Sequence, residues 1–285
     1  MNPAAPKIAF IGVGRMGKPI AINIVKAGYD LVAYDLRREQ LEDLTRLGAK
    51  AAASPQAAAR EADIIEIIVV DDEQVEQVLT APDGVLQGAR ADAIITIHST
   101  VYPATVRRLA RVAQGKGVHV IDAPVSGGET GARDQALCYM VAGDPALLED
   151  CRKLFLTSAS DIFHLGALGN AAAAKMILQV VICIDMLAAH EAEVLAQKCG
   201  LDFGLLQQVL HKSASQSFVV DNWLHRFKLE HNPMPIRQRR TEVFQKSLGP
   251  SLEFAQELGL SLEGAELAQR VMPQIMGIDK QGIGR

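Results

Sequence analysis

The sequence predicts an α/β domain followed by an all-α domain, with one long helix joining the two. Three observations support this prediction. Residues 8 to about 125 alternate short apolar runs with helical patterns, the stretch 170–199 is rich in helix formers, and only helical periodicity follows Gly200. We place the α/β domain at residues 1–165 and the all-α domain, which includes the long helix, at residues 166–285.

The strands of the first domain are predicted from short runs rich in Ile and Val that are followed by Gly, Asp, Ser or Pro. Runs this apolar indicate strands buried on both faces, which is typical of a parallel sheet covered by helices. The predicted strands are Ile8–Ile11, Leu31–Tyr34, Ile64–Val70, Ala93–His98 and His119–Ala123, with a further one over Ala136–Ala142. The predicted helices between them cover residues 18–27, 38–46, 56–61, 73–80 and 103–115.

The second domain is predicted to contain helices only. Its first helix opens after Gly166 and Gly169, and Ala, Leu, Met, Glu and Gln dominate it. A helix of this length exceeds a typical domain helix, so we expect it to span the junction between the domains. Further helices are predicted at residues 204–213, 217–227, 240–258 and 262–274. Their aliphatic faces indicate a buried interface, and we expect a homodimer or homotetramer.

A glycine-rich loop directly follows the first predicted strand. Gly12, Gly14 and Gly17 have the spacing G-x-G-x-x-G and lead into a predicted helix. In the Rossmann fold the first glycine permits a tight turn, the second lets the backbone approach a pyrophosphate, and the third allows close packing of helix on strand. The free N–H groups of the helix N-terminus attract the phosphates. We therefore predict a Rossmann domain that binds a dinucleotide through Gly12, Val13, Gly14, Arg15 and Met16.

The choice of cofactor depends on Asp35, which follows the second predicted strand. A carboxylate at this place accepts hydrogen bonds from the ribose hydroxyls of the adenosine and repels a 2′-phosphate. We therefore expect NAD, while the neighbouring Arg37 and Arg38 leave NADP possible. Val70, at the end of another predicted strand, is also predicted to contact the cofactor.

Composition and charge exclude several classes of function. A net charge of −4 and a pI of about 6.0 provide no basic excess for a phosphate backbone, so no nucleic-acid partner is expected. The four cysteines form no C-x-x-C pair and no His/Cys cluster, and we predict neither a metal site nor a disulfide framework. The apolar runs are shorter than the ~20 residues of a bilayer crossing, and the N-terminus lacks the apolar region of a signal peptide. We expect no membrane contact and a cytoplasmic location.

Four motifs together resemble the β-hydroxyacid dehydrogenase family, which includes 3-hydroxyisobutyrate dehydrogenase and tartronate semialdehyde reductase. In chain order they are Gly-Val-Gly-Arg-Met-Gly17, Asp122-Ala-Pro-Val-Ser-Gly-Gly128, Gly166-x-x-Gly169 followed by Lys175, and Lys246 in Phe-Gln-Lys-Ser-Leu. The resemblance covers nearly the whole chain.

The resemblance implies a Rossmann domain, a long connecting helix and a helical domain that also forms the oligomer. It implies reversible hydride transfer between a nicotinamide and a small, anionic 3-hydroxy acid or the corresponding semialdehyde. It assigns Lys175 as the catalytic acid/base, Thr100 to the neighbourhood of the nicotinamide, and Lys246 to that of the cofactor. The substrate carboxylate is assigned to Ser126, Gly127 and Gly128.

The residues around Lys175 support that role on chemical grounds. Hydride loss from an alcohol also requires a base, or a positive charge that stabilises the developing alkoxide. Lys175 lies in the mostly apolar stretch 171–181, where desolvation favours a lowered pKa. The alternative is a lysine that snorkels at a helix surface, and for Gly127 and Gly128 it is a simple turn. His98, at the end of a predicted strand, is interpreted as a hydrogen-bonded histidine, with contact to the cofactor as the alternative.

The chain departs from the family pattern near the lysine. The asparagine usual one helical turn after Lys175 is Gln179, which can still face the substrate because positions i and i+4 share a face. We therefore include Gln179 among the substrate-binding residues. Three other positions also differ from the usual Gly, Asn and acidic residues, namely Ala171, Leu178 and Ser247.

A basic segment, Pro235-Ile-Arg-Gln-Arg-Arg240, precedes Lys246. Arg237, Arg239 and Arg240 either bind a second anionic group of the substrate or form a solvated loop or subunit contact. These departures leave two alternatives to a 3-hydroxy acid dehydrogenase. One is an imine or semialdehyde reductase of the same fold, and the other is a nicotinamide-binding protein without catalysis.

Overall fold

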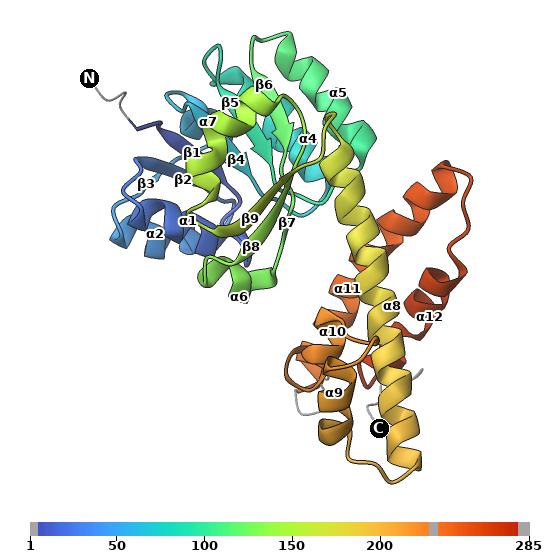
Figure 1. Cartoon of the computed structure of the whole chain (residues 1–285). Helices are drawn as coiled ribbons and strands as arrows, with labels where there is room; N and C mark the ends of the chain where they lie inside the picture. The colour runs from blue at the N-terminus through green and yellow to red at the C-terminus, as the bar shows by residue number, and fades with distance from the viewer. Residues whose placement is uncertain (1–4, 228–232, 279–285) are drawn as a thin grey trace. The chain divides into compact units, whose positions relative to one another are not determined.

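The structure, a computed structural model, describes residues 5–227 and 233–278. Some side chains between residues 236 and 243 lie outside the described part. The chain divides into two compact units, Met1–Lys175 and Met176–Arg285, and the division falls within one continuous helix (Figure 1). The domain boundary expected after residue 165 stays a prediction.

The first unit is built on a six-stranded parallel sheet with the strand order β3-β2-β1-β4-β5-β6. The strands are β1 (Ile8–Ile11), β2 (Leu31–Tyr34), β3 (Lys50–Ala51), β4 (Ile64–Ile67), β5 (Ile94–Ile97) and β6 (His119–Asp122). The predicted parallel sheet is confirmed. Such a sheet binds ligands beyond the carboxyl ends of its strands, next to the point where the strand order reverses, here between β1 and β4.

The observed strands differ from the predicted ones in two respects. The predicted strand Ile64–Val70 ends at Ile67, because Val69 donates its backbone N–H to the Ser99 hydroxyl instead of to a neighbouring strand. Strand β3 is not predicted by the sequence, since its two residues are both exposed and lack an apolar run.

Helices cover both faces of the sheet, and each face has its own apolar core. On one face Phe10 of β1 packs with Ile20 of α1, and on the other Ile65 of β4 packs with Leu79 of α4. The first face is covered by α1 (Gly17–Lys26), α2 (Glu42–Arg46) and α7 (Pro145–Phe155), and the second by α3 (Pro55–Ala59), α4 (Asp72–Thr80) and α5 (Pro103–Gln114) (Figure 1). The double burial explains why the strands are apolar on both sides.

A second, three-stranded sheet follows β6 in the chain. Strand β7 (Val125–Ser126) pairs antiparallel with β8 (Leu137–Val141), which pairs parallel with β9 (Ala159–His164). The short helix α6 (Gly128–Arg133) connects β7 to β8. The sequence predicts only β8 of this sheet, because β7 has two residues and most residues of β9 are exposed.

The described part of the second unit contains only helices, as predicted. Its core surrounds the buried Trp223, whose indole N–H donates to the Glu193 carboxylate at 2.8 Å, and includes Met186 and Leu248. The elements are α8 (Asn170–Lys198), α9 (Phe203–His211), α10 (Phe218–Asp221), a π-helical turn (Trp223–Phe227), α11 (Met234–Glu257) and α12 (Glu263–Ile275). Helix α11 begins six residues before the predicted start at residue 240, since Pro235 is accommodated in its first turn.

Helix α8 is long and apolar enough to cross a membrane by length and composition alone. Its residues Cys183, Met186 and Ala189 are buried in the core of the helical unit. Ile177 and Val181 are exposed, at 62% and 53%. Core packing therefore accounts for part of the apolar composition of α8, and the exposed side chains form a separate apolar stripe.

Candidate active site

The glycine loop after β1 has the geometry of a dinucleotide-binding turn. Gly12 has a φ of +95°, and a Cβ atom there would collide with the carbonyl oxygen of Ile68. A Cβ atom on Gly17 would collide with the carbonyl oxygen of Gly12, so the start of α1 packs directly on the loop. At Gly14 the nearest group to a Cβ atom is the Arg37 guanidinium, at 3.9 Å. The backbone at Gly14 is therefore open to a phosphate group.

Asp35 lies at the end of β2 and is joined to the glycine loop. Its Oδ2 accepts the backbone N–H of Val13 at 2.8 Å, and its Oδ1 accepts the backbone N–H of Arg37 at 2.9 Å. The Asp35 side chain is only 10% exposed, and Arg37 Nε lies 3.6 Å from Oδ1. Each carboxylate oxygen keeps a further lone pair, so the group can also accept hydrogen bonds from ribose hydroxyls.

The loops that follow β4 and β5 are joined by a hydrogen bond at the carboxyl edge of the sheet. Val69 donates its backbone N–H to Ser99 Oγ at 2.8 Å. The next residues in the two loops are Val70, whose side chain is 59% exposed, and the partly buried Thr100. Val70 is therefore an exposed apolar residue in the loop after β4, the strand that neighbours β1 in the sheet.

The glycine loop is also linked to the segment after β7. Arg15 Nε lies 3.7 Å from Glu129 Oε2 at the surface, while Met16 packs partly buried against the core of its face. In the interior, Asn23 of α1 donates its side-chain N–H to the carbonyl oxygen of Ala132 in α6 at 2.7 Å. The predicted cofactor loop and the predicted substrate loop are therefore neighbours.

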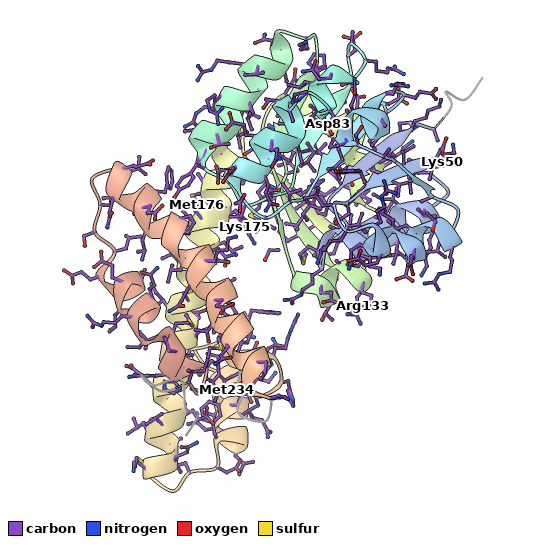
Figure 2. All side chains as sticks on the ribbon, turned by 180° about the vertical axis from the view of Figure 1, so that it is seen from behind. Lys50, Asp83, Arg133, Lys175, Met176 and Met234 are labelled. Atoms are coloured by element: carbon purple, nitrogen blue, oxygen red, sulfur yellow. The ribbon has the colours of Figure 1, made fainter. Side chains whose placement is uncertain are left out.

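Lys175, on the second turn of α8, reaches back to β7. Its Nζ donates to the carbonyl oxygen of Val125 at 2.9 Å. Val125 immediately precedes Ser126, the first residue of the predicted substrate loop. Burial lowers the pKa of Lys175 from 10.5 to about 8. The lysine, labelled in Figure 2 at the last position of the first unit, therefore lies beside that loop with a side chain that titrates near physiological pH.

The loop itself turns on two glycines. Gly127 and Gly128 have φ angles of +131° and +67°, which other residues rarely adopt. A Cβ atom on Gly127 would approach Leu137 Cδ2 to 2.9 Å. Ser126 is half-buried and pairs with Cys138 of β8. A serine hydroxyl and successive backbone N–H groups in such a turn are suited to binding a carboxylate.

The two parts of the chain match two family models. Residues 7–166 match the family described as the NAD binding domain of 6-phosphogluconate dehydrogenase. Residues 169–282 match the family described as "NAD-binding of NADP-dependent 3-hydroxyisobutyrate dehydrogenase". The chain belongs to the β-hydroxyacid dehydrogenase family.

Relatives from this family align over nearly the whole chain. The 2-(hydroxymethyl)glutarate dehydrogenase of Eubacterium barkeri is 30% identical over 97% of this chain and 98% of its own length. The NAD-dependent L-serine dehydrogenase of Pseudomonas aeruginosa is 31% identical over 94% and 88%. Among solved structures, Mycobacterium tuberculosis 3-hydroxyisobutyrate dehydrogenase with L-serine is 28% identical, with a TM-score of 0.81 over 94% of this chain and 93% of that one. The first unit is thus the NAD(P)-binding domain of the family.

Asp122 is a further residue of the candidate site, and the sequence pattern predicts no role for it. Its Oδ1 accepts the backbone N–H of Gly169 at 3.0 Å, and its Oδ2 accepts that of Ala172 at 2.9 Å. The carboxylate thereby caps the start of α8, and burial raises its pKa more than these hydrogen bonds lower it. A role for Asp122 could have been inferred from its position, because it is an acidic residue at the end of a predicted strand and the first residue of the Asp122–Gly128 motif.

The remaining predicted site residues lie in the second unit. Gln179 follows Lys175 by one turn of α8 and is half-buried, and Lys246 lies in α11 with an exposed side chain. The backbone of the basic segment belongs to α11, but the side chains of Arg237, Arg239 and Arg240 lie outside the described residues.

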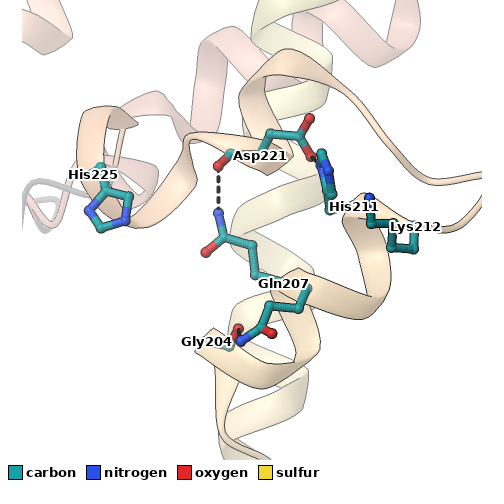
Figure 3. Close-up of a pocket in the computed structure, with 7 residues that line it drawn as sticks. Gly204, Gln207, His211, Lys212, Asp221 and His225 are labelled. Atoms are coloured by element: carbon teal, nitrogen blue, oxygen red, sulfur yellow. Dashed lines mark hydrogen bonds and ion pairs between the residues drawn. The ribbon is translucent and has the colours of Figure 1, made fainter.

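The helical unit also has a pocket of about 440 Å³ between α9 and α10 (Figure 3). His211 Nδ1 lies 2.8 Å from Asp221 Oδ1, and this contact lowers the pKa of Asp221. Gln207 donates to the carbonyl oxygens of Val220 and Asp221 at 2.7 and 3.0 Å. None of the residues predicted for cofactor or substrate binding lines this pocket, and most of the side chains that line it are exposed.

Proposed function

We propose that the chain is an NAD-dependent dehydrogenase that transfers hydride between the nicotinamide and a small 3-hydroxy acid or its semialdehyde. The observation that carries this proposal is the placement of Lys175 Nζ, 2.9 Å from the carbonyl oxygen of Val125 and so beside Ser126. A titratable amine next to an anion-binding loop is the arrangement that oxidation of a hydroxy acid requires. The family membership supports the reaction class.

The residues of the first unit fit a dinucleotide. The open backbone at Gly14 and the helix N-terminus after it accommodate the pyrophosphate, and Asp35 binds the adenosine ribose. Val13, Arg15 and Met16 complete the loop, while Val70 and Thr100 lie along the adjoining strand ends. Lys246 of the helical unit is proposed to contact the cofactor as well. When bound, the nicotinamide accepts or returns the hydride of the reaction.

Lys175 serves as the general acid and base. In its neutral form the amine has two N–H groups and one lone pair. One N–H is held by the carbonyl oxygen of Val125, which orients the lone pair toward a substrate hydroxyl placed beside Ser126. The amine takes the hydroxyl proton during oxidation, and the ammonium returns it during reduction. A pKa of about 8 lets both forms exist near neutral pH.

Ser126, Gly127 and Gly128 bind the substrate carboxylate through the serine hydroxyl and the backbone N–H groups of the turn. This places the carboxylate one residue from the carbonyl group that holds Lys175. Gln179, one helical turn further along α8, contacts the group that distinguishes one 3-hydroxy acid from another. The longer side chain of Gln179, in place of the usual asparagine, selects a substrate of different size.

The names of the relatives narrow the substrate class. 2-(Hydroxymethyl)glutarate, L-serine and 3-hydroxyisobutyrate each have a hydroxymethyl group on the carbon that bears a carboxylate. We extend this shared part to the substrate of this chain. The basic segment containing Arg237 is the candidate for binding a second anionic group, as in a dicarboxylate.

Activity assays with NAD+ and NADP+ test this function. The substrates are 3-hydroxyisobutyrate, L-serine, 2-(hydroxymethyl)glutarate and glycerate, each assayed with the wild type, Lys175→Ala and Lys198→Ala. Lys198 is the matched control because it lies on the last turn of the same helix and is exposed. Turnover that is lost only in Lys175→Ala supports the proposal. Binding of NADH without turnover of any substrate contradicts it and favours a non-catalytic role, while turnover of imines alone favours an imine reductase.

We further propose that the chain forms a homodimer or homotetramer through its helical unit and that it acts in the cytoplasm. Ile177, Val181 and Ile184 form an apolar stripe along α8, and their side chains are 38–62% exposed. A second copy of the chain would bury this stripe. Light scattering should therefore show a dimer or tetramer in the wild type and a smaller species in Val181→Lys. A monomeric wild type would contradict the assembly and leave the proposed reaction untouched.

A further inference from the structure

A buried polar pair lies in the core of the first unit. Glu66 of β4 is 1% exposed, and His98, which directly follows β5, is 3% exposed. Glu66 Oε1 lies 3.4 Å from His98 Nε2, and the hydroxyl oxygen of Thr96 lies 3.0 Å from the same nitrogen. His98 is therefore a hydrogen-bonded interior histidine, which was one of the two interpretations of its sequence position.

The second ring nitrogen of His98 contacts the backbone of another strand end. Nδ1 lies 2.7 Å from the carbonyl oxygen of Ala123, the residue after β6. A carbonyl oxygen can only accept a hydrogen bond, so Nδ1 must carry the proton. Nε2 then faces Thr96 and Glu66. The imidazole thus contacts side chains of β4 and β5 through Nε2, and it donates one hydrogen bond from Nδ1 to the segment after β6.

Two aromatic rings hold the imidazole in this orientation. Tyr139 of β8 and Phe155 of α7 each meet the His98 ring edge to face, with centroids 5.6 and 5.7 Å away. Tyr139 and Phe155 stack on each other at 4.9 Å, and both are fully buried. Rotation of the imidazole would require these close-packed rings to move. The direction of the bond to Ala123 is therefore fixed by the core.

Burying this polar pair carries a cost in stability. Glu66 Oε2 has no hydrogen-bond partner in the described part of the chain, and a buried polar atom without a partner destabilises a fold. Apolar residues of similar volume often give a fold at least as stable as one with a buried pair of titratable side chains. Apolar side chains, however, cannot donate a hydrogen bond to a backbone carbonyl oxygen. His98 donates such a bond to the carbonyl oxygen of Ala123.

We propose that His98, supported by Glu66, is a positioning residue that sets the substrate loop against Lys175. Ala123 is two residues before Val125, whose carbonyl oxygen accepts the hydrogen bond from Lys175. The His98 bond therefore adds to the backbone hydrogen bonds that join this short segment to β5 and β8, while Lys175 contacts it from helix α8. This role rests on the proposed function, because the group that it places is the general acid and base.

Without the bond from His98, the short segment keeps its backbone hydrogen bonds, among them Ala123 N–H to the carbonyl oxygen of Ile97 at 2.8 Å and Met140 N–H to that of Pro124 at 3.0 Å. It loses the side-chain bond that His98 supplies to the carbonyl oxygen of Ala123. The carbonyl oxygen of Val125 can then shift relative to Lys175 Nζ, and the lone pair of the amine loses its direction. A misplacement of about 1 Å costs about 10²-fold in rate when the reacting atoms must be aligned. The cofactor loop follows a different strand, β1, so NADH binding should not change.

The hydrogen bond itself is tested without any substrate. In wild-type protein labelled with [15N]histidine, the ring nitrogens of His98 are observed by NMR and assigned by their loss in His98→Asn. We expect Nδ1 to be protonated and protected from exchange with solvent. We expect the same Nδ1 signal in Thr96→Val, which removes only a contact at Nε2. An unprotonated Nδ1 in the wild type overturns the proposal, whether or not the protein turns over any substrate.

The consequence for the reaction is tested with three variants. His98→Leu removes the donor, and we expect kcat to fall by about 10- to 100-fold with the Kd for NADH within about twofold of the wild type. His98→Asn retains an N–H at the Nδ1 position and should recover most of the lost kcat. Thr96→Val should stay within about twofold of the wild type.

Two results distinguish positioning from a purely structural role. The pH midpoint of oxidation should shift in His98→Leu, where the surroundings of Lys175 change, and return in His98→Asn. A lower Tm in His98→Leu with unchanged kcat and pH midpoint would overturn the proposal. If His98→Leu does not fold, Glu66→Gln takes its place, because it keeps the shape of the side chain and replaces the carboxyl group that faces Nε2 with an amide. An unchanged kcat and pH midpoint in Glu66→Gln then count against the role of the pair.

Discussion

Lys175 Nζ lies 2.9 Å from the carbonyl oxygen of Val125, so a helix residue and a strand residue that are 50 positions apart in the chain form one hydrogen bond. Asp122, three residues before Val125, caps the start of the same helix. The segment from Asp122 to Val125 is therefore attached to α8 at both of its ends. Both bonds are made by groups of the chain itself, which thereby hold the Lys175 amine beside the predicted substrate loop.

Replacing Lys175 with Met should abolish proton transfer and leave the fold intact. We expect kcat to fall by about 10²–10⁴-fold, the usual contribution of a general acid or base. NADH binding should be unchanged, because the residues predicted to hold the dinucleotide are elsewhere in the unit. Steady-state kinetics and NADH fluorescence measure the two effects. Activity within about threefold of the wild type would mean that another group moves the proton.

The rate should depend on pH through the titration of Lys175. Oxidation requires the neutral amine, so its rate should rise with pH and level off above about 8. Reduction requires the ammonium, so its rate should fall as the pH rises through the same value. Assays of both directions from pH 6 to 10 check the two signs. Parallel changes in the two directions would assign the titration to a different group.

The same titration has a consequence for stability. The folded pKa of Lys175 lies near 8 and its ordinary value is 10.5, so between these values the unfolded chain binds more protons than the folded one. The contribution of Lys175 to the free energy of unfolding therefore rises with pH in this window. Thermal unfolding of the wild type and Lys175→Met should show it. The Tm of the wild type, relative to that of the variant, should increase from pH 8 to pH 10.5 and not decrease.

Two glycines of the cofactor loop should respond differently to alanine. Gly12→Ala combines a positive φ with a collision against Ile68, so we expect loss of folded protein. Gly14→Ala meets nothing closer than the Arg37 guanidinium at 3.9 Å, so the Tm should be retained while the Kd for NADH rises at least about tenfold. Gly28→Ala is the control for backbone strain, because its φ is +91° with nothing within 4 Å. Unchanged NADH binding in Gly14→Ala would exclude close approach of a phosphate at this position.

Asp35 should decide between NAD and NADP. Asp35→Asn keeps an acceptor for the ribose and removes the charge that repels a 2′-phosphate, so the preference for NAD should fall by about 10- to 100-fold. The ratio of kcat/KM values for the two cofactors measures the change. Asp30→Asn is the matched control, since Asp30 precedes the same strand at its other end and pairs with Lys50. If the ratio were the same in Asp35→Asn and the wild type, the preference for NAD over NADP would have to come from other residues, such as Arg37.

Asp122→Ala should lower both stability and activity. The substitution leaves the N–H groups of Gly169 and Ala172 without their acceptor, and the loss of such a cap costs about 1–2 kcal/mol of unfolding free energy. Because Lys175 follows one turn later, kcat should fall as well. Asp144→Ala removes the exposed cap of α7 and should lower stability without an effect on kcat. Urea unfolding and kinetics on both variants separate the two effects, and equal kcat values would rule out a role for the Asp122 cap in placing Lys175.

Local patterns in the sequence were sufficient for much of the sheet and for the helical domain. Strands β1 and β2 match their predicted bounds. A short apolar run that lies between a turn and a glycine or acidic residue is too short for a buried helix and therefore indicates a strand. Strands β3, β7 and β9 were missed, since they exist through pairing with a neighbour and have little apolar pattern of their own. Helix α7 was also missed, although Asp144 followed by Pro145 is a recognisable helix start.

The sequence by itself determined the fold class, the glycine loop and the presence of an apolar stretch around Lys175, because each of these depends on the order of nearby residues. Only the tertiary structure decided that Lys175 reaches Val125, that Asp122 caps α8, and that a buried Glu66–His98 pair supports Ala123. These contacts join strands and helices from distant parts of the chain. Their partners are selected by the topology of the sheet and the packing of its two cores, which no local pattern in the sequence records.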